Sequence, residues 1–358
     1  MPLPNQIIIA SAGAGKTTHI VKSLDIPKAK KSLVVTYTLN NEEEIRKKFF
    51  KEYGFIPSHV KIKTWFSFLL DDFVRPYQSA LYPDHRVDGL AFIDGISTQY
   101  IPESNIKKHY FSATNDIFSD KIAKFGVKLN QLTGGFVIQR LEQIYDTIYV
   151  DEVQDLAAWD LDVLDILLNS NIKIVLVGDP RQATYKTNNG SKYSKYSGVR
   201  ILEKFKEWRD VGLCELDLMN HSYRCNQEIC NFADRFFPDM EKTESRHTEI
   251  SGHDGIFIVR SAYVNEYIGK FSPKILRYNR REKCMGFSAS NYKESKGLTF
   301  QRVLIFPHNP LKELLKNADF SSLTEPSALY VAVTRARYSV GIVYDAEFSV
   351  EGLNLYKP

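Results

Sequence analysis

The feature that most constrains this chain is an apolar run that leads directly into a glycine-rich loop near the amino terminus. Gln6–Ala10 (QIIIA) is rich in β-branched residues and is predicted to be a strand. The loop Ser11–Gly15 follows, and Thr18–Leu24 has the residue pattern of a helix. Small residues allow several backbone N–H groups to face one concavity, which suits phosphate oxygens, and the helix amino terminus adds its positive dipole end. This order predicts an α/β protein whose first loop binds a phosphate-bearing ligand.

The same alternation of strand-like and helix-like segments continues along most of the 358 residues. Further strands are predicted at Ser32–Thr36, Thr147–Asp151, Ile172–Gly178, Gly255–Arg260, Val303–Pro307 and Ser339–Tyr344. Helices are predicted at Asn41–Glu52, Leu156–Leu168 and Ser327–Arg337. Such alternation is typical of a parallel sheet with helices on both faces, and the length indicates two such domains.

The pattern divides the chain into two α/β domains and an insertion. The first domain is predicted to comprise residues 1–71 and 131–205, and the second residues 206–358. Between residues 72 and 130 the alternation is lost, which predicts a small, mostly helical insertion. The polar stretch 186–198 is predicted to be an exposed loop.

Composition narrows the class of protein. Lys and Arg number 47 against 43 Asp and Glu, and the resulting net charge of +4 permits nucleic-acid binding without requiring it. The four cysteines form no CxxC pair, which argues against a zinc site and favours free thiols in a reducing compartment. No apolar stretch reaches the length of a membrane span, and residues 1–6 lack the features of a secretory signal. We therefore expect a cytoplasmic protein without a membrane partner.

Two segments carry the residues expected for nucleotide hydrolysis. Lys16 is expected to contact the β- and γ-phosphates of a nucleoside triphosphate, and the Thr17 hydroxyl to bind Mg²⁺. Asp151 and Glu152 lie at the end of a predicted strand, where ligands bind in open α/β sheets. Asp151 is expected to bind the same Mg²⁺, and Glu152 to activate the attacking water. The residues predicted to surround the nucleotide, which the resemblance described next implies to be ATP, are Ala10, Ser11, Ala12, Gly13, Ala14, Gly15, Lys16, Thr17 and Thr18.

The order of the motifs resembles the UvrD/Rep branch of the superfamily 1 DNA helicases. Ala10–Thr17 is similar to the AxAGxGKT motif of that family, and Asp151–Asp155 (DEVQD) to its DExQD box. Further similar segments follow in the family's order: Thr36–Ile45, Thr64–Phe68, Gly178–Tyr185 (GDPRQATY), Ser222–Cys225 (SYRC), Pro273–Asn279, Glu294–Phe300 (ESKGLTF) and Tyr330–Arg337 (YVAVTRAR). The resemblance implies two RecA-like P-loop domains in tandem and a DNA-dependent ATPase.

The resemblance also implies roles for residues outside the phosphate loop. Gln182 would sense the γ-phosphate, and Tyr223 would stack on adenine. Arg224 and Arg335 would contact the phosphates as arginine fingers. The residues implied to contact single-stranded DNA are Tyr37, Thr38, Asn40, Thr64, Trp65, Phe66, Tyr185 and Lys293. Stacking on aromatic side chains is independent of sequence and suits a translocase, while core packing is an equal alternative for Trp65 and Phe66.

Several positions depart from the family pattern. Thr18 stands where the family carries Arg, and no Gln-containing adenine motif precedes the loop, so adenine recognition is expected to depend on Tyr223. The segment after Tyr185 lacks the family's WRGA sequence, which removes an aromatic residue that grips DNA. About 65 residues separate Arg224 from Asn291, where full members insert a large subdomain. We therefore expect a minimal motor core.

Two functions are left open. The first is an ATP-driven translocase or helicase on single-stranded DNA, moving 3′→5′ because Gln182–Tyr185 (QATY) resembles the branch with that polarity. The second is an ATP-switched protein that closes on DNA or on a partner without processive unwinding. Either function uses ATP and Mg²⁺, and either is compatible with a protein partner such as a nuclease or a replication, repair or defence factor.

Overall fold

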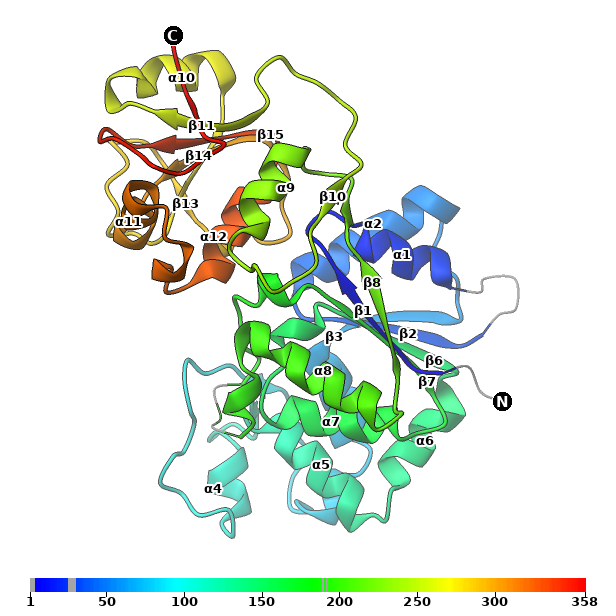
Figure 1. Ribbon diagram of the computed structural model, residues 1–358. Coiled ribbons are helices and arrows are strands. Elements are labelled where there is room, and N and C mark those ends of the chain that lie inside the picture. The colour runs from blue at the N-terminus through cyan, green and yellow to red at the C-terminus, as the bar shows by residue number, and fades with distance from the viewer. Residues whose placement is uncertain (1–3, 25–29, 189, 191) are drawn as a thin grey trace. The chain divides into compact units, whose positions relative to one another are not determined.

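The computed structural model describes residues 4–24, 30–188, 190 and 192–358, which form two compact units (Figure 1). The first unit contains Met1–Ile9, Lys16–Pro180 and Tyr185–Asp217, and the second contains Ala10–Gly15, Arg181–Thr184 and Leu218–Pro358. Residues 1–3 of the segment predicted to lack a signal, and residues 189 and 191 of the predicted loop 186–198, lie outside the described residues. No helix in the described part of the chain is both long and apolar enough to cross a membrane.

The first unit is built on a six-stranded parallel sheet of order β3-β2-β6-β7-β1-β8. Its strands are β1 (Gln6–Ala10), β2 (Ser32–Thr36), β3 (Val60–Thr64), β6 (Thr147–Asp151), β7 (Lys173–Gly178) and β8 (Glu215–Met219). In the register of the sheet, Ile7 lies opposite Leu176, and Val34 lies opposite Tyr149. Every residue of β2 and of β6 is buried, as expected for β-branched strands covered on both faces.

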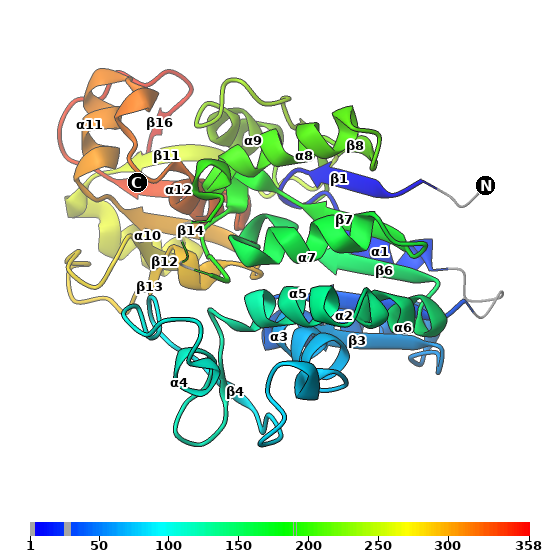
Figure 2. The same ribbon diagram turned by 90° about the horizontal axis from the view of Figure 1, so that it is seen from below.

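Helices cover both faces of this sheet. α1 (Lys16–Ser23) and α2 (Leu39–Tyr53) lie on one face, and α5 (Ile122–Leu132), α6 (Phe136–Ile144) and α7 (Trp159–Leu168) lie on the other (Figures 1 and 2). α8 (Ile201–Asp210) packs Phe205 and Trp208 into the core of the same unit. Because of this packing the first unit extends to Asp217, whereas the predicted boundary fell after residue 205.

The segment predicted to be a helical insertion is less regular than expected. It follows a π-helix (Leu69–Val74) and contains α4 (Ile106–Tyr110) and the short strands β4 (Leu90–Ala91) and β5 (Ile117–Phe118), which pair in parallel. Phe73 and Phe125 belong to the same buried cluster as Ile148 of β6. The segment is therefore packed onto the core of the first unit.

The polar stretch 186–198 is not the exposed loop that its composition predicts. Thr187 and Asn188 are buried. The Thr187 hydroxyl donates a hydrogen bond to Asp160, and Nδ2 of Asn188 donates to the carbonyl of Asp120 at 2.7 Å. Polar side chains are buried where their polar atoms find partners. These partners are distant in sequence, so the local composition contains no sign of them.

The second unit is built on another six-stranded parallel sheet, of order β13-β12-β14-β15-β11-β16. Its strands are β11 (Gly255–Val259), β12 (Lys274–Arg277), β13 (Ser290–Asn291), β14 (Phe300–Phe306), β15 (Ala336–Val343) and β16 (Asn354–Leu355). The helices are α9 (Gln227–Asp234), α10 (Val264–Phe271), α11 (Asn309–Asn317) and α12 (Pro326–Val333), and a two-stranded parallel ribbon is formed by β9 (His221–Ser222) and β10 (Glu244–Ser245). Two parallel sheets with helices confirm the predicted fold class.

Candidate nucleotide and nucleic-acid sites

The phosphate loop lies between the carboxyl end of β1 and the first residue of α1. Gly13 and Gly15 have φ angles of +77° and +84°, a conformation that favours glycine. A Cβ atom at Gly13 would lie 2.6 Å from Cβ of Arg224 and 2.6 Å from Oγ of Ser222. The Ser222 hydroxyl donates to a loop carbonyl at 2.7 Å, and the carbonyl of Gly13 accepts the N–H of Tyr223. Within the second unit, the SYR motif therefore contacts the backbone of the phosphate loop.

Four side chains predicted to act in hydrolysis come together in the first unit. Oγ1 of Thr17 lies 3.4 Å from Oδ2 of Asp151, and Nζ of Lys16 lies 3.8 Å from Oε1 of Glu152. Glu152 has a φ of 57°, in the left-handed region, directly after β6. Residues other than glycine adopt this backbone conformation only where the surrounding structure stabilises it.

Gln154 contributes to this site in a way that the sequence analysis did not predict. Its side chain is 3% exposed, and its Oε1 accepts the backbone N–H of Asp179 at 3.1 Å. Its Nε2 donates to Oε2 of Glu152. Gln154 therefore fixes the orientation of the Glu152 carboxylate, and the glutamine of the DEVQD motif was the available signal.

The electrostatics of the two acidic residues suit a divalent cation. Burial, followed by the neighbouring charge of Glu152, raises the pKa of Asp151 to about 7, and Lys16 opposes this shift. A cation at this point would stabilise the charged carboxylate, and carboxylate and hydroxyl oxygens are ligands that Mg²⁺ prefers. Asp151 and Thr17 are the residues that could hold it.

Gln182 and Arg335 form a buried pair within the second unit. Nη2 of Arg335 donates to Oε1 of Gln182 at 2.8 Å, and Nε donates to the carbonyl of Val331 at 3.1 Å. Nζ of Lys296 donates to the carbonyl of Gln182 at 3.0 Å. Arg335 is only 2% exposed. A buried guanidinium is stable when such oxygens surround it, and the predicted γ-phosphate sensor is therefore linked directly to the predicted arginine finger.

Tyr223 and Arg224 differ strongly in their surroundings. Tyr223 is 53% exposed, and its ring lies edge-on to that of His221 with centroids 5.0 Å apart. Arg224 donates from Nη1 to the carbonyl of Thr334 at 3.2 Å. The exposed ring of Tyr223 follows β9 and is available for stacking on a base.

Aromatic side chains form a row along the carboxyl edge of the first sheet. Tyr37 follows β2, and its ring centroid lies 6.1 Å from that of Phe66 and 6.4 Å from that of Tyr185. Phe92 continues the row from the insertion, because its ring meets Phe66 edge-on at 5.5 Å and is 71% exposed. The sequence analysis missed Phe92 because the irregular insertion carries no recognisable motif. We call Tyr185, Tyr37, Phe66 and Phe92 the aromatic row.

Trp65 does not belong to the aromatic row. It begins α3 (Trp65–Phe68), is 1% exposed, and donates from Nε1 to Oδ1 of Asp160 at 2.7 Å. A side chain fixed in this way cannot stack on a base without unpacking the core. The implied contact of Trp65 with DNA is therefore corrected to core packing, the alternative that the sequence left open.

The other predicted nucleic-acid contacts are divided between helix ends and the surface. The Thr38 and Thr64 hydroxyls cap α2 and α3 by accepting backbone N–H groups. Asn40 is exposed in the first turn of α2. Nζ of Lys293 lies 3.0 Å from Oε2 of Glu325 in the second unit. Roles for these residues in binding stay predictions.

Comparison with known proteins assigns the chain to a family. A family model described as the viral superfamily 1 RNA helicase core domain matches residues 113–344. The chain belongs to this family. A second model, described as an AAA domain, matches residues 1–188, so the amino-terminal part also belongs to that family. The superfamily 1 helicase core that the motif order predicted is confirmed.

Solved structures of the arterivirus nonstructural protein 10, a helicase, are similar to this helicase core. One is 14% identical with a TM-score of 0.49, and the match covers 95% of this chain and 59% of the arterivirus chain. A complex of the arterivirus protein with DNA is 14% identical with a TM-score of 0.48, covering 95% and 60%. The helicase core thus spans about three fifths of the length of these structures. No curated protein matches the chain.

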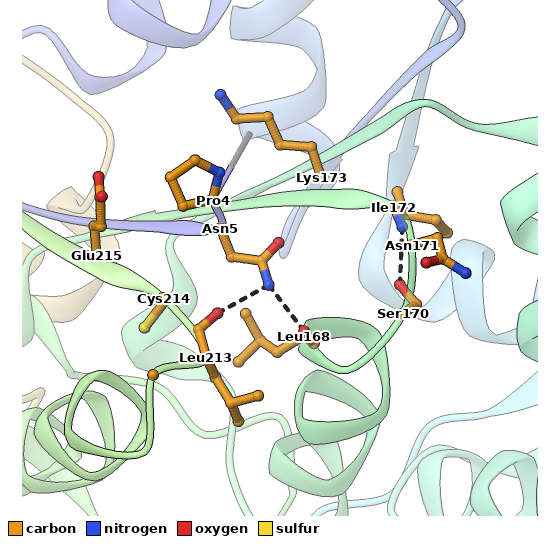
Figure 3. Close-up of a pocket in the computed structure, with 11 residues that line it drawn as sticks. Pro4, Asn5, Leu168, Ser170, Asn171, Ile172, Lys173, Leu213, Cys214 and Glu215 are labelled. Carbon is orange, nitrogen blue, oxygen red and sulfur yellow. Dashed lines mark hydrogen bonds between the residues drawn. The ribbon is translucent and has the colours of Figure 1, made fainter. Parts of the chain in front are cut away.

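The helicase core also has a hollow at the opposite edge of the first sheet, where β1, β7 and β8 begin (Figure 3). Its volume is about 440 Å³. Asn5 lies in this hollow and donates from Nδ2 to the carbonyls of Leu168 and Leu213 at 2.8 and 3.0 Å. These bonds join the residue before β1 to the last residue of α7 and to the segment between α8 and β8. We assign this edge to the stability of the fold, because ligands of such sheets bind at the carboxyl ends of the strands.

Proposed function

We propose that this helicase core is a UvrD/Rep-like, ATP-driven translocase of single-stranded DNA that moves 3′→5′ and couples hydrolysis to closure of its two units on the strand. The observation that supports the proposal most is the convergence of Lys16, Thr17, Asp151 and Glu152, with the Glu152 carboxylate fixed by Gln154. This arrangement meets the requirements of phosphate binding, cation binding and water activation at one point.

Hydrolysis would follow from the chemistry of these residues. Lys16 and the loop N–H groups bind the phosphates, and Mg²⁺ held by Thr17 and Asp151 would neutralise part of their charge. Glu152 accepts the proton of the water whose oxygen attacks the γ-phosphorus, while the bond to the bridging oxygen of ADP breaks. Arg224 and Arg335 stabilise the charge that develops on the γ-phosphoryl group. Gln182 senses the γ-phosphate and transmits the loss of this group to the second unit.

The aromatic row is the proposed binding surface for bases. Its rings lie at the same edge of the first sheet as the nucleotide site, and Phe92 is largely exposed. Stacking accepts any base and does not read the 2′-hydroxyl, so single-stranded RNA is tested beside DNA. The ATP-switched binding protein is the second candidate, favoured by the short interval between Arg224 and Asn291.

The experiment that tests the proposal is the ATPase rate with and without single-stranded DNA or RNA, in the presence of Mg²⁺. We expect stimulation by single strands, and we expect the Glu152→Gln variant to bind ATP without stimulated turnover. Strand displacement on tailed duplexes separates the two candidates, because a switch would bind the tail without displacing the strand. A rate that is indifferent to both nucleic acids would overturn the translocase.

A further inference from the structure

A second hollow lies at the carboxyl edge of the second sheet. Its volume is about 580 Å³, within the range of roughly 300–1,000 Å³ typical of small-ligand sites. The residues that line it follow four different strands. Ser261 comes after β11, Arg281 after β12, Lys312 after β14 and Asp345 after β15. Four loops therefore converge on one hollow.

The strand order relates this hollow to the nucleotide site of the first sheet. Each sheet has six positions from one edge to the other. When its strands are taken in chain order, they occupy the fifth, second, first, third, fourth and sixth positions, and this series is the same in both sheets. β11 thus corresponds to β1, which leads into the phosphate loop, and β14 corresponds to β6, which leads to Asp151 and Glu152. The loops around the hollow are the counterparts of the loops that carry the nucleotide site.

The hollow also lies beside the switch point of its sheet. β12 and β14 are neighbours, but the chain leaves β12 toward β13 on one side and leaves β14 toward β15 on the other. Connections that diverge in this way leave a crevice outside the carboxyl ends of the two strands, which is where open α/β sheets bind ligands.

The charges around the hollow favour an anion. Arg281, Lys283 and Lys312 line it and are exposed, and among the described residues none of these three side chains has an ion pair. Two acidic residues line it as well. Asp345 accepts the N–H and the hydroxyl of Ser261 at 2.8 and 2.6 Å, and Glu282 leaves one further negative charge. The cationic side chains that line the hollow therefore outnumber the acidic ones by one, and none of the three is held in an ion pair among the described residues.

We propose that this hollow binds a phosphate-bearing ligand of nucleotide size, with Arg281, Lys283 and Lys312 on the phosphate. Phe306, Val343 and Met285 add apolar surface for the body of the ligand. An arginine fork and lysine ammonium groups are the side chains that bind phosphate most strongly. The ligand is either a free nucleotide or a nucleotide within a strand, and both present the same phosphate chemistry.

The hollow is a binding site and not a second hydrolytic site. The chain after β11 runs Arg260-Ser-Ala-Tyr263 and contains no glycine-rich loop. The N–H of Ser261 is already bonded to Asp345, so phosphate recognition depends on side-chain cations. A free nucleotide in this hollow would be independent of the proposed translocase function, whereas a strand in the hollow rests on that function.

A fluorescent label at the rim tests the proposal directly. All four native cysteines are buried, so an Ala346→Cys variant of the full chain can be labelled selectively at the hollow with an environment-sensitive dye. AMP, pyrophosphate and short single-stranded DNA are titrated separately. A Lys16→Ala background removes signals that originate at the phosphate loop, and a label at Ile250→Cys, which is 89% exposed and does not line the hollow, is the control for non-specific effects.

We expect a saturable response at Ala346→Cys that survives Lys16→Ala and is missing at Ile250→Cys. Adding Arg281→Ala and Lys283→Ala should weaken binding at least about tenfold, a change of roughly 1.4 kcal/mol. The charge-matched control, Lys316→Ala with Lys357→Ala, should not weaken it. A response to AMP identifies a free nucleotide, and a response to DNA alone identifies a strand. No saturable response to any probe, or equal weakening by both double variants, would overturn the proposal.

Discussion

Glu152 combines two features that cost folding stability, a left-handed backbone and a carboxylate next to another carboxylate, and such costs are typical of functional residues. Its backbone is left-handed, its carboxylate lies beside that of Asp151, and Gln154 and Lys16 both contact it. Glu152→Gln keeps the size and removes the proton acceptor. We expect ATP affinity to be unchanged and turnover to fall by about 10²–10⁴-fold, because general-base catalysis has that magnitude. Lys16→Ala should instead weaken ATP binding itself, measured by equilibrium titration, and substantial turnover by Glu152→Gln would remove Glu152 as the base.

Tyr223 carries a prediction about nucleotide choice. Its ring is 53% exposed, and stacking discriminates poorly between purines. We expect kcat/KM for GTP to lie within about an order of magnitude of that for ATP, a gap of roughly 1.4 kcal/mol. Parallel measurement of the two hydrolysis rates tests this. A far larger preference for ATP would show that another residue reads the adenine edge.

For Trp65 and Phe66 the sequence alone could not predict whether each ring packs in the core or stacks on bases. The two rings are adjacent in sequence and both are buried in the core of the first unit, but Trp65 is fixed by a hydrogen bond to Asp160, whereas Phe66 lies between Tyr37 and Phe92. Asp160 and Phe92 are remote in sequence from the motif. Without these partners the sequence could not exclude base stacking for Trp65, and a role of Phe66 in binding bases stays a prediction.

Phe92 gives the insertion a function that can be tested. If the aromatic row binds bases, Phe92→Ala should weaken binding of single-stranded DNA by about 1–3 kcal/mol, the value of one stacked base, and Phe92→Tyr should retain it. Fluorescence anisotropy of a labelled oligonucleotide measures the change. Tyr100→Ala is the matched control, since Tyr100 is 92% exposed in the same insertion and lies outside the row. Equal losses in both variants would argue against a specific role for Phe92.

α4 and α5 are joined through Glu103, and this contact predicts a pH dependence. Burial alone would raise the pKa of Glu103, but hydrogen bonds from Lys124, Lys128 and Tyr110 outweigh it and lower the pKa to about 2. Because the pKa of Glu103 is lower in the folded state, its carboxylate stabilises the fold at pH values above the ordinary pKa of 4.5. This contribution is lost as the pH falls through about 2. Glu103→Gln should therefore unfold more easily than the parent at neutral pH.

Denaturant unfolding at a series of pH values measures the difference in free energy of unfolding between the parent and Glu103→Gln. We expect it to be constant above pH 4.5 and to narrow progressively below. The variant Glu347→Gln, an exposed acidic residue in the second unit, is the control. A difference that does not change with pH would mean that Glu103 acts through packing alone.

The elements that the sequence predicted best are those defined by local signals. β1, β2 and β6 have the bounds expected from their β-branched runs. The helix expected at Ser327–Arg337 instead ends at Val333, and β15 begins at Ala336. Arg335 lies in the turn between them, where its bond to Gln182 depends on a residue far away in sequence. Such long-range contacts explain why the boundary could not be predicted.

The two six-stranded sheets among the described residues have the same strand order, and of these two sheets the first is the one followed by the phosphate loop and the DEVQD carboxylates. The order of motifs was sufficient to predict this architecture and the superfamily 1 helicase core. Translocation requires that hydrolysis in one part changes the grip on a strand. The bond between Arg335 and Gln182 is the kind of contact that loss of the γ-phosphate could rearrange.

Release of streptavidin from biotinylated single strands tests translocation most directly. The chain is mixed with ATP, Mg²⁺ and oligonucleotides that carry biotin at either the 5′ or the 3′ end, and streptavidin release is followed over time. We expect ATP-dependent release from the 5′ end, little release from the 3′ end, and none with Glu152→Gln. Release from the 3′ end would contradict the assigned direction. ATP hydrolysis stimulated by the strands without release from either end would contradict translocation itself and identify the protein as an ATP-driven switch.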